Sequence, residues 1–415
     1  MVSSPLVVAR PLDPPTSARR VRLSEEASFW LLASLPVSFL AGSSAPTPLY
    51  AVYQARWHFS PITTTVAFGI YALAVLASLL TLGRLSDHIG RRPVLLVAVS
   101  LQALVMFWFG HVASASELVL VRVVQGLSTG GALSAIGAGL VDLHRQRGTV
   151  ANAVAPMLGT ATGGIASGLL VRYLPAPEQL VYYLLGGVFA AQVLGVFSMV
   201  EPGQRRPGAL ASLRPQLGLP VELRPAFFVA LPLLVASWAL VGFYGSLGPA
   251  LLGRLFGGGS VLLGGLSLFV IALSGATAVL ALREKPARVL MLVGTTSLFV
   301  GVLVTLLAIA VGSRFGFFAG AAISGVGFGT GFQGAIRDLV PTAPLHARAG
   351  VLSVLLIVSY LAMGLPAMGA GFRVAATHDL LGTARELGSI VAALALLSLG
   401  PQLTRRRRSS PGVVA

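Results

Sequence analysis

The chain has 415 residues, of which 55% are hydrophobic and only 10% are charged, against roughly 25% charged in an average soluble domain. No soluble core could hide so much apolar surface, so we expect an all-α protein of the membrane. A net charge of +16 would suit a nucleic-acid-binding protein. The charges, however, lie in short loops between apolar runs, which argues against a nucleic-acid partner. The lack of cysteine excludes disulfides and thiolate metal sites, and no other metal site or cofactor is expected.

The N-terminal segment 1–28 lacks the apolar stretch and adjacent cleavage site of a signal peptide, so it is expected to be a cytoplasmic tail. Apolar runs then follow, each near the length of about 20 residues that crosses a bilayer as a helix. Twelve are present, at 29–50, 62–82, 94–112, 117–141, 150–172, 180–200, 226–251, 260–281, 289–311, 315–336, 349–373 and 386–403.

Lysine and arginine predict the orientation of the spans, because cytoplasmic loops carry an excess of them. With both termini inside, Arg122 lies within a span and most of the other basic residues lie in cytoplasmic loops. Those on the outer side are Arg56, Arg172, Arg254, Arg314, Arg373 and Arg385. We therefore expect both termini to be cytoplasmic. Abundant Gly, Ala and Arg with a single Lys favour a GC-rich bacterial genome, and hence the bacterial cytoplasmic membrane.

The first span is interrupted near its end by Pro46 and Pro48. Proline removes a helix hydrogen bond, and nearby hydroxyls can bond the freed carbonyls. Such a helix suits either a substrate path or an ordinary bent end near the outer surface. Its polar and aromatic residues are Ser43, Ser44, Thr47, Tyr50, Tyr53 and Gln54.

A charged turn at 83–93 joins the second and third spans. By itself it is a basic loop that obeys the positive-inside rule. Its spacing, however, resembles the loop signature of the major facilitator superfamily, Gly-x-x-x-Asp-basic-x-Gly-basic-basic. His88 departs from the usual basic residue. The matching residues are Gly83, Asp87, Gly90, Arg91 and Arg92.

The resemblance implies a fold of twelve transmembrane helices in two six-helix halves that rock about a midplane site. It also implies that Asp87, Arg91 and Arg92 lock the two halves on the cytoplasmic side in one state. Asp142 and Arg145 are expected to join this gate.

Arg122 lies in the fourth span, where a charge usually faces an interior or a cavity and is functional. A structural alternative is an arginine whose long side chain reaches the outer interface. The pattern Arg122-x-x-Gln125-Gly126 resembles the fourth-helix motif of the same superfamily. The resemblance implies a proton-transfer role for Arg122 and a supporting hydrogen bond from Gln125.

Coupling to protons would need a titratable partner, yet no Asp or Glu lies at the middle of a span. Many proton-coupled relatives have a buried carboxylate, and this chain departs from them. If a proton gradient drives transport, Glu117 or Asp142 at the ends of the fourth span must serve with Arg122. Facilitated diffusion is the alternative.

The fifth span contains Gly159, Gly163 and Gly164. Small residues at such intervals let two helices approach closely, and packing alone would explain them. The run also resembles the antiporter motif Gly-Pro-x-x-Gly-Gly of the superfamily, with Thr160 in place of the proline. That motif marks exporters.

The connection 201–224 is the longest between spans and divides the chain into halves at 29–200 and 225–403, followed by a basic cytoplasmic tail at 404–415. A weak repeat supports this division, because Asp142-Leu143 and Asp338-Leu339 end corresponding spans. Duplicated halves around a midplane site are a recurrent transporter architecture.

Substrate contacts are expected from amphipathic side chains within the spans, although each alone also suits packing or an interfacial belt. Their character suits a lipophilic or weakly cationic compound. The candidates are Tyr50, Tyr71, Asn152, Met157, Trp238, Tyr244, Gln333 and Tyr360.

Other classes of function fit less well. Gly126-Leu127-Ser128-Thr129-Gly130 matches Gly-x-Ser-x-Gly, but that motif acts as a nucleophile elbow on a strand-to-helix turn, and here it lies within an apolar span. We therefore expect that the protein is not an enzyme. A receptor of the same fold would not need alternating-access loop residues. An uptake symporter or facilitator for a sugar or metabolite is the main alternative, although more Asn, Gln, Asp and Trp would then be expected inside the spans.

The sequence thus predicts a secondary active transporter of the bilayer, similar to drug/proton antiporters. It would act as a monomer and export a small compound in exchange for protons.

Overall fold

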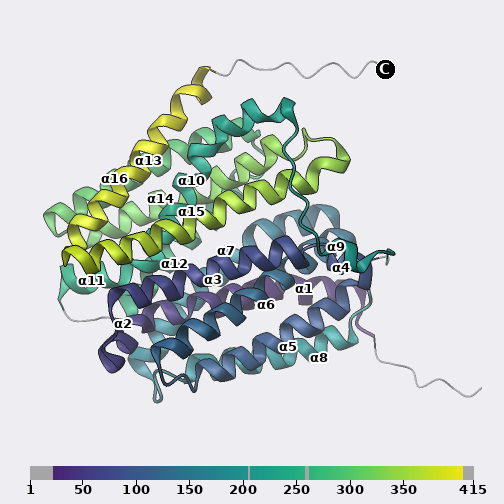
Figure 1. The fold of residues 1–415 in the computed structure, drawn as a ribbon, viewed down its shortest axis with the longest axis horizontal. Helices are drawn as coiled ribbons and strands as arrows, with labels where there is room; N and C mark the ends of the chain where they lie inside the picture. Colours follow the sequence, from purple (N-terminus) through teal and green to yellow (C-terminus); the bar gives the residue numbers. More distant parts are fainter. Residues whose placement is uncertain (1–21, 204–205, 258–260, 405–415) are drawn as a thin grey trace, which may run out of the picture.

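The computed structural model describes residues 22–203, 206–257 and 261–404. The basic tail expected after residue 404 and most of the expected N-terminal tail lie outside this part of the chain. Within it the fold is helical, and no strand is present. The helices run side by side in two groups, α1–α8 and α10–α16, and the connection that carries α9 joins them (Figure 1).

The first group contains a broken first span and a short helix in the charged loop. Its helices are α1 (Glu25–Ser44), α2 (Pro46–Trp57), α3 (Pro61–Leu82), α4 (Leu85–Ile89), α5 (Arg91–Phe109), α6 (Ala115–Leu143), α7 (Arg145–Tyr173) and α8 (Leu180–Ser198).

The connection and the second group repeat this plan, again with a broken first span. The elements are α9 (Ala209–Ser212), the 3-10 helix η1 (Val221–Leu223), α10 (Arg224–Ser246), α11 (Gly248–Phe256), α12 (Val261–Ala281), α13 (Ala287–Val311), α14 (Arg314–Leu339), the 3-10 helix η2 (Leu345–Ala347), α15 (Arg348–Thr377) and α16 (Leu380–Thr404).

Twelve helical segments of the described chain are long and apolar enough to cross a membrane. The prediction of an all-α protein with twelve spans is therefore confirmed. The first span is longer than the expected 29–50 and covers Glu25–Trp57. It starts earlier because Ser24 accepts a hydrogen bond from the backbone N–H of Ala27, which caps a helix whose first turn is acidic.

Large apolar side chains cover the outside of both groups. The exposed fraction is 70% for Val97, 71% for Leu194 and 64% for Leu307, all of them within candidate spans. In water such a surface would aggregate, whereas in lipid it contacts acyl chains, and the helix satisfies its own backbone groups. The protein is therefore an integral membrane protein.

Two pairs of helices make the most extensive contacts between the groups. α7 packs against α12, and α3 packs against α15. Several glycines make this approach possible. A Cβ atom on Gly164 of α7 would lie 3.1 Å from the Cβ of Leu268 on α12, and one on Gly364 of α15 would lie 3.2 Å from the carbonyl oxygen of Gly69 on α3. The two halves thus touch backbone to backbone through small residues.

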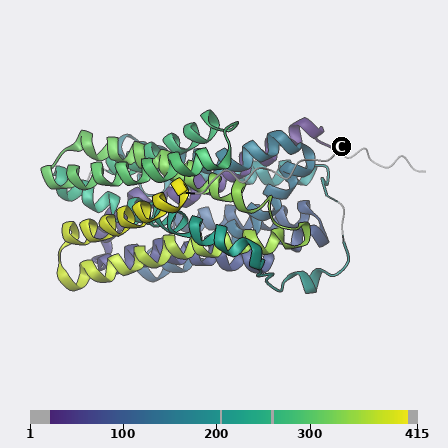
Figure 2. The ribbon, with the colours of Figure 1, turned by 90° about the horizontal axis from the view of Figure 1, so that it is seen from above.

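The two ends of the bundle differ. Helices α2 and α11 lie at one end, and α4 and α9 lie at the other (Figure 1). We call these the α2–α11 end and the α4–α9 end. The view from above shows the same lengthwise run of helices, with the connection between the halves at the edge of one end (Figure 2).

Candidate functional site

The break between α1 and α2 supplies an unused backbone acceptor. In a continuous helix the carbonyl of Gly42 would accept a hydrogen bond from the N–H of residue 46, but Pro46 has none. The side-chain amide of Gln125 on α6 donates to this carbonyl instead, at 3.0 Å. Gln125 is fully buried. Its side-chain amide replaces the backbone N–H that Pro46 lacks and so gives the buried Gly42 carbonyl its hydrogen bond.

Arg122 lies one turn from Gln125 and is only 1% exposed. Its guanidinium donates to the Ala67 carbonyl of α3 at 3.2 Å and to the Ser43 carbonyl of α1 at 2.9 Å. It also donates to Oε1 of Gln125 at 2.6 Å. Arg122 therefore links α6 to α1 and α3, and the structure does not support a side chain that only reaches toward the interface.

The face of Tyr71 completes this environment, because the Arg122 guanidinium carbon lies 4.3 Å from its ring centroid. We call Arg122, Gln125, Tyr71 and the carbonyls of Gly42 and Ser43 the arginine network. Hydrogen bonds to a charged group contribute about 1.5–3 kcal/mol each, and a cation–π contact up to about 2 kcal/mol. Together they can offset the several kcal/mol that burial of one charge costs.

Among the described residues, Arg122 forms no ion pair. The structure does not bring the two expected carboxylates to it. Glu117 lies in the first turn of α6, where it accepts from the N–H of Ala113, while its own N–H donates to Ser114. Asp142 lies near the opposite end of α6 and pairs with Arg91 at 3.2 Å. The arginine network thus carries an uncompensated positive charge.

The charged loop forms a compact cluster at the α4–α9 end. Arg91 pairs with Asp87 and Asp142, and donates to the Ser86 hydroxyl at 2.7 Å. Gly90 has φ +102°, a backbone conformation that side-chain-bearing residues rarely adopt, so a glycine is required between α4 and α5.

This cluster includes an acid that sequence reasoning missed. Glu201, which follows α8, accepts from the backbone N–H groups of Arg91 at 2.6 Å and Arg92 at 3.1 Å. These are donors that the first turn of α5 leaves free, and a carboxylate is favoured there. Sequence alone gives a weak signal, an acid just after the sixth span.

The loop residues bond within their own half and to the connection. The hydroxyl of Ser134 on α6 donates to the Gly83 carbonyl, and Arg92 donates to the Phe197 carbonyl. His88 contacts the backbone oxygen of Pro207 at 2.8 Å. In the part of the chain that the structure describes, no hydrogen bond or ion pair joins this loop to α10–α16. A lock between the halves through Asp87 and Arg91 is thus absent from this state.

Arg145, the other expected gate residue, is exposed at the start of α7. Arg147 makes the contacts there instead. Its guanidinium pairs with Glu26 at 2.7 Å and lies 4.6 Å from the ring centroid of Phe29, which ties α7 to α1.

The glycines of the antiporter-like run divide by the partner that they face. Gly159 approaches Val37 and Leu40, and Gly163 approaches Ala41, all on α1 of the same half. Gly164 faces α12 of the other half. Packing therefore explains Gly159 and Gly163 within one half, whereas Gly164 forms part of the contact between halves.

The expected substrate contacts fall into separate places. Trp238 and Tyr360 lie together, with ring centroids 5.0 Å apart. Tyr71 belongs to the arginine network. The buried hydroxyl of Tyr50 has no hydrogen-bond partner within the described part of the chain. Asn152 donates to the Gly137 carbonyl at 2.9 Å.

Met157 and Gln333 have different surroundings. Met157 is buried between α7 and α12, in a cluster with Val154 and Ala276. Gln333 is partly exposed on α14.

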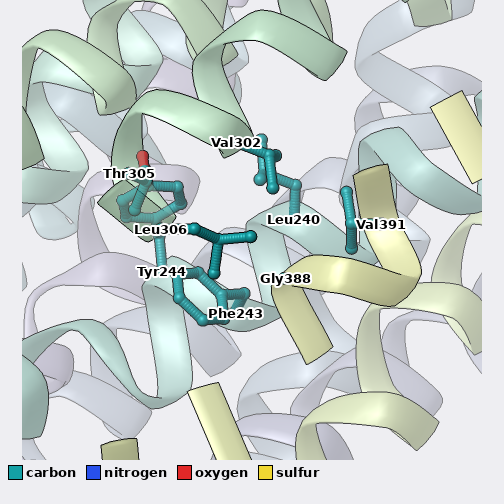
Figure 3. A pocket seen from close by; sticks show the side chains of 8 residues that line it. All are labelled: Leu240, Phe243, Tyr244, Val302, Thr305, Leu306, Gly388 and Val391. Atoms are coloured by element: carbon teal, nitrogen blue, oxygen red, sulfur yellow. The ribbon is translucent and has the colours of Figure 1, made fainter. Parts of the chain in front are cut away.

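Tyr244 does not face the other half. It is fully buried among α10, α13 and α14, and its hydroxyl hydrogen-bonds Thr305 at 2.7 Å. The two residues line a pocket inside the second half together with Val302, Leu306 and Val391 (Figure 3). Its volume of about 10 Å³ holds no more than a water molecule. This pocket is too small for a transported compound.

Comparison with known proteins decides the family. The family model described as Major Facilitator Superfamily matches residues 32–367, which is most of the chain. The chain belongs to the major facilitator superfamily. It is accordingly a membrane transporter and not an enzyme.

Curated relatives of this superfamily member include two proteins described as "Multidrug resistance protein MdtL". The one from Salmonella typhi is 25% identical over 304 residues, covering 69% of this chain and 73% of that protein. The one from Klebsiella pneumoniae subsp. pneumoniae is 26% identical over 164 residues, which is 37% of this chain and only 38% of that protein.

Solved structures share the fold of this superfamily member. One is described as the nucleoside transporter NupG, with a TM-score of 0.67 and 11% identity over 92% of this chain and 100% of that one. Another is a bacterial homologue of the human lysosomal transporter Spinster, inward-facing and unoccupied, with a TM-score of 0.65 and 16% identity over 91% of this chain and 95% of that one.

Proposed function

We propose that the protein exports a small lipophilic or weakly cationic compound from the cytoplasm in exchange for protons. The observation that carries the proposal is the arginine network, a buried and uncompensated positive charge bonded to the break in the first span. Relatives described as multidrug resistance proteins support the direction of transport.

In this proposal the α4–α9 end faces the cytoplasm, as the distribution of lysine and arginine favours. The compound enters from that end and leaves at the α2–α11 end when the halves rock. The protein acts as a monomer in the bacterial cytoplasmic membrane.

Arg122 acts without releasing its own proton, because a guanidinium stays protonated in proteins. It holds α1, α3 and α6 in register and imposes a positive field on the space between the halves. Asp142 is the carboxylate that exchanges protons, and its loss of charge releases Arg91 from one of its two ion pairs. Proton binding at the α4–α9 end thereby favours movement of that end.

The test uses inverted membrane vesicles that contain the protein and are energised to an acidic interior. A panel of lipophilic neutral compounds, lipophilic cations and antibiotics is added while the pH gradient is recorded. We expect at least one compound to collapse the gradient in wild-type vesicles and to fail with Arg122→Ala at equal protein levels. No response to any compound would contradict export by proton exchange.

Uptake is the competing outcome. The fold is shared with a structure described as a nucleoside transporter, so radiolabelled nucleosides and sugars form the second panel. Accumulation of one of them in right-side-out vesicles, without a response in the first panel, would replace the export proposal.

A further inference from the structure

Four aromatic rings from three helices of the second half meet near the middle of their spans. Trp238 of α10 lies 5.1 Å from Phe332 and 5.8 Å from Phe328 of α14, and 5.0 Å from Tyr360 of α15, measured between ring centroids. Both phenylalanines meet the indole edge-to-face, at 78°. We call these four residues the aromatic cluster.

The aromatic cluster lies at the boundary between the halves. Trp238 and Tyr360 pack with the core of the first half, which includes Tyr71. Phe328 packs beside Met157 of α7. Trp238, Phe328 and Phe332 are nevertheless partly exposed, so their packing is incomplete. This is the position that a transported compound occupies in a protein whose halves rock about a central site.

The aromatic cluster contains a hydrogen-bond donor without an acceptor. The indole Nε1 of Trp238 is buried and has no partner among the residues that the structure describes. Buried tryptophans usually find an acceptor for this N–H, and leaving it unpaired destabilises the protein. A ligand acceptor that bonds it would remove that destabilisation, so the site favours a compound with a carbonyl oxygen or an unprotonated ring nitrogen.

The charges around the aromatic cluster disfavour a cation. Within the described spans the acids all lie near helix ends, namely Glu25, Glu26, Glu117, Asp142, Glu222, Asp338 and Glu386. Glu26, Asp142 and Glu386 form ion pairs with Arg147, Arg91 and Arg373. The charge on the first-half side is Arg122, on the face of Tyr71. A buried cation without a carboxylate loses its hydration, and aromatic faces return only part of that cost.

We infer that the compound this protein carries is flat, conjugated and formally uncharged, and that its acceptor atom takes the hydrogen bond of the Trp238 indole. The inference rests on the proposed export function and narrows it, because it removes cations from the candidate substrates. Trp238 and Tyr360 already contact each other, so a planar ring packs against the partly exposed side of Trp238 beside Phe328 and Phe332. The indole N–H selects compounds with an acceptor at the ring edge.

Three probes with the same tricyclic outline test the inference: acridone, which is neutral and has a carbonyl; anthracene, which has no acceptor; and 10-methylacridinium, which is a cation. Equilibrium binding is measured with the protein in lipid nanodiscs, without a pH gradient and with empty discs subtracted. Acridone is expected to bind up to about tenfold more tightly than anthracene, since one hydrogen bond contributes up to about that factor, and more tightly than the cation.

The variants separate the hydrogen bond from packing. Trp238→Phe keeps an aromatic ring and removes the N–H, so it should weaken acridone about tenfold and leave anthracene unchanged. Trp30→Phe, the same substitution at an exposed position near the start of α1, should change neither. Tighter binding of 10-methylacridinium than of acridone, or unchanged acridone binding in Trp238→Phe, would overturn the inference.

This binding assay needs no pH gradient and no transport, so its result is independent of the test of the export proposal. Binding with the expected selectivity but without compound-driven proton movement would contradict proton-coupled export and support the site. Proton movement that only cations drive, and that Trp238→Phe leaves unchanged, would support proton-coupled export and contradict the inferred substrate site.

Discussion

At the scale of single residues, the role proposed for Arg122 depends on the shape of its guanidinium group. Its Nε and Nη1 atoms reach acceptors on α3, α1 and α6 at once. A lysine would keep the charge, but it is a point donor on a flexible stem and cannot span the same acceptors.

We therefore expect Arg122→Lys to lower coupled transport at least about tenfold, a barrier change of about 1.4 kcal/mol. The measurement is compound-driven proton flux in vesicles with matched protein levels. Full activity of Arg122→Lys would mean that charge alone suffices, which would contradict the role given to the network.

Glycine positions allow a second prediction at this scale. A Cβ on Gly163 would collide with the backbone of Ala41, whereas one on Gly187 of α8 meets nothing within 4 Å. Gly163→Val should destabilise the folded protein by about 1–3 kcal/mol, the usual cost of overpacking. Thermal unfolding of the purified protein is the readout, with Gly187→Val as the matched control. Equal unfolding midpoints for the two variants would contradict the close contact between α7 and α1.

Sequence reasoning identified Arg122 because one charge inside an apolar run is conspicuous. It did not find the acceptor for Gln125, because the Gly42 carbonyl becomes available only through a proline four residues further along. Sequence reasoning also did not show that Trp238 and Tyr244 have different surroundings. Both are amphipathic side chains on one helix, and only the packing of α10 shows that one faces the other half and one faces α13.

At the scale of elements, the start of α5 is held by an acid from a distant part of the chain. Glu201 bonds two free N–H groups there, across more than a hundred residues of sequence. The sequence indicated a charged glycine turn at 83–93 but gave only a weak signal for this partner, an acid just after the sixth span. The pairing depends on how α8 ends beside α5.

Glu201→Gln should lower the stability of the folded protein by about 1 kcal/mol, because it weakens a charge-assisted cap. Glu222→Gln is the control, since Glu222 is exposed and forms no hydrogen bond or ion pair within the described chain. Thermal unfolding in detergent measures both. A larger shift for Glu222→Gln than for Glu201→Gln would contradict this assignment.

At the scale of the whole molecule, the twelve spans and the two-half plan follow from apolar run length and from the loops. The contact surface between the halves could not be predicted from these features. It depends on which glycines of α7 face α12, and spacing alone cannot distinguish Gly163 from Gly164.

Because the chain contains no cysteine, introduced cysteine pairs can test this contact directly. Gly164→Cys with Leu268→Cys joins α7 to α12, where the two Cβ positions lie 3.1 Å apart. Oxidation should form a disulfide that stops transport, and a reductant should restore it. The control pair, Pro249→Cys with Gly264→Cys, lies at 3.2 Å within one half, so its disulfide should leave transport intact. Undiminished transport through a fully cross-linked Gly164–Leu268 pair would contradict rocking of the halves.

The most direct test of the central claim is whether a pH gradient alone drives a compound uphill. Purified protein is placed in liposomes with an acidic interior, and the accumulation of an identified substrate is followed against its own gradient. The account predicts accumulation well above equilibrium with the wild-type protein and equilibration without accumulation with Arg122→Ala. If the wild-type protein only equilibrates the compound, or if Arg122→Ala accumulates it equally, proton-coupled transport that depends on the arginine network is contradicted.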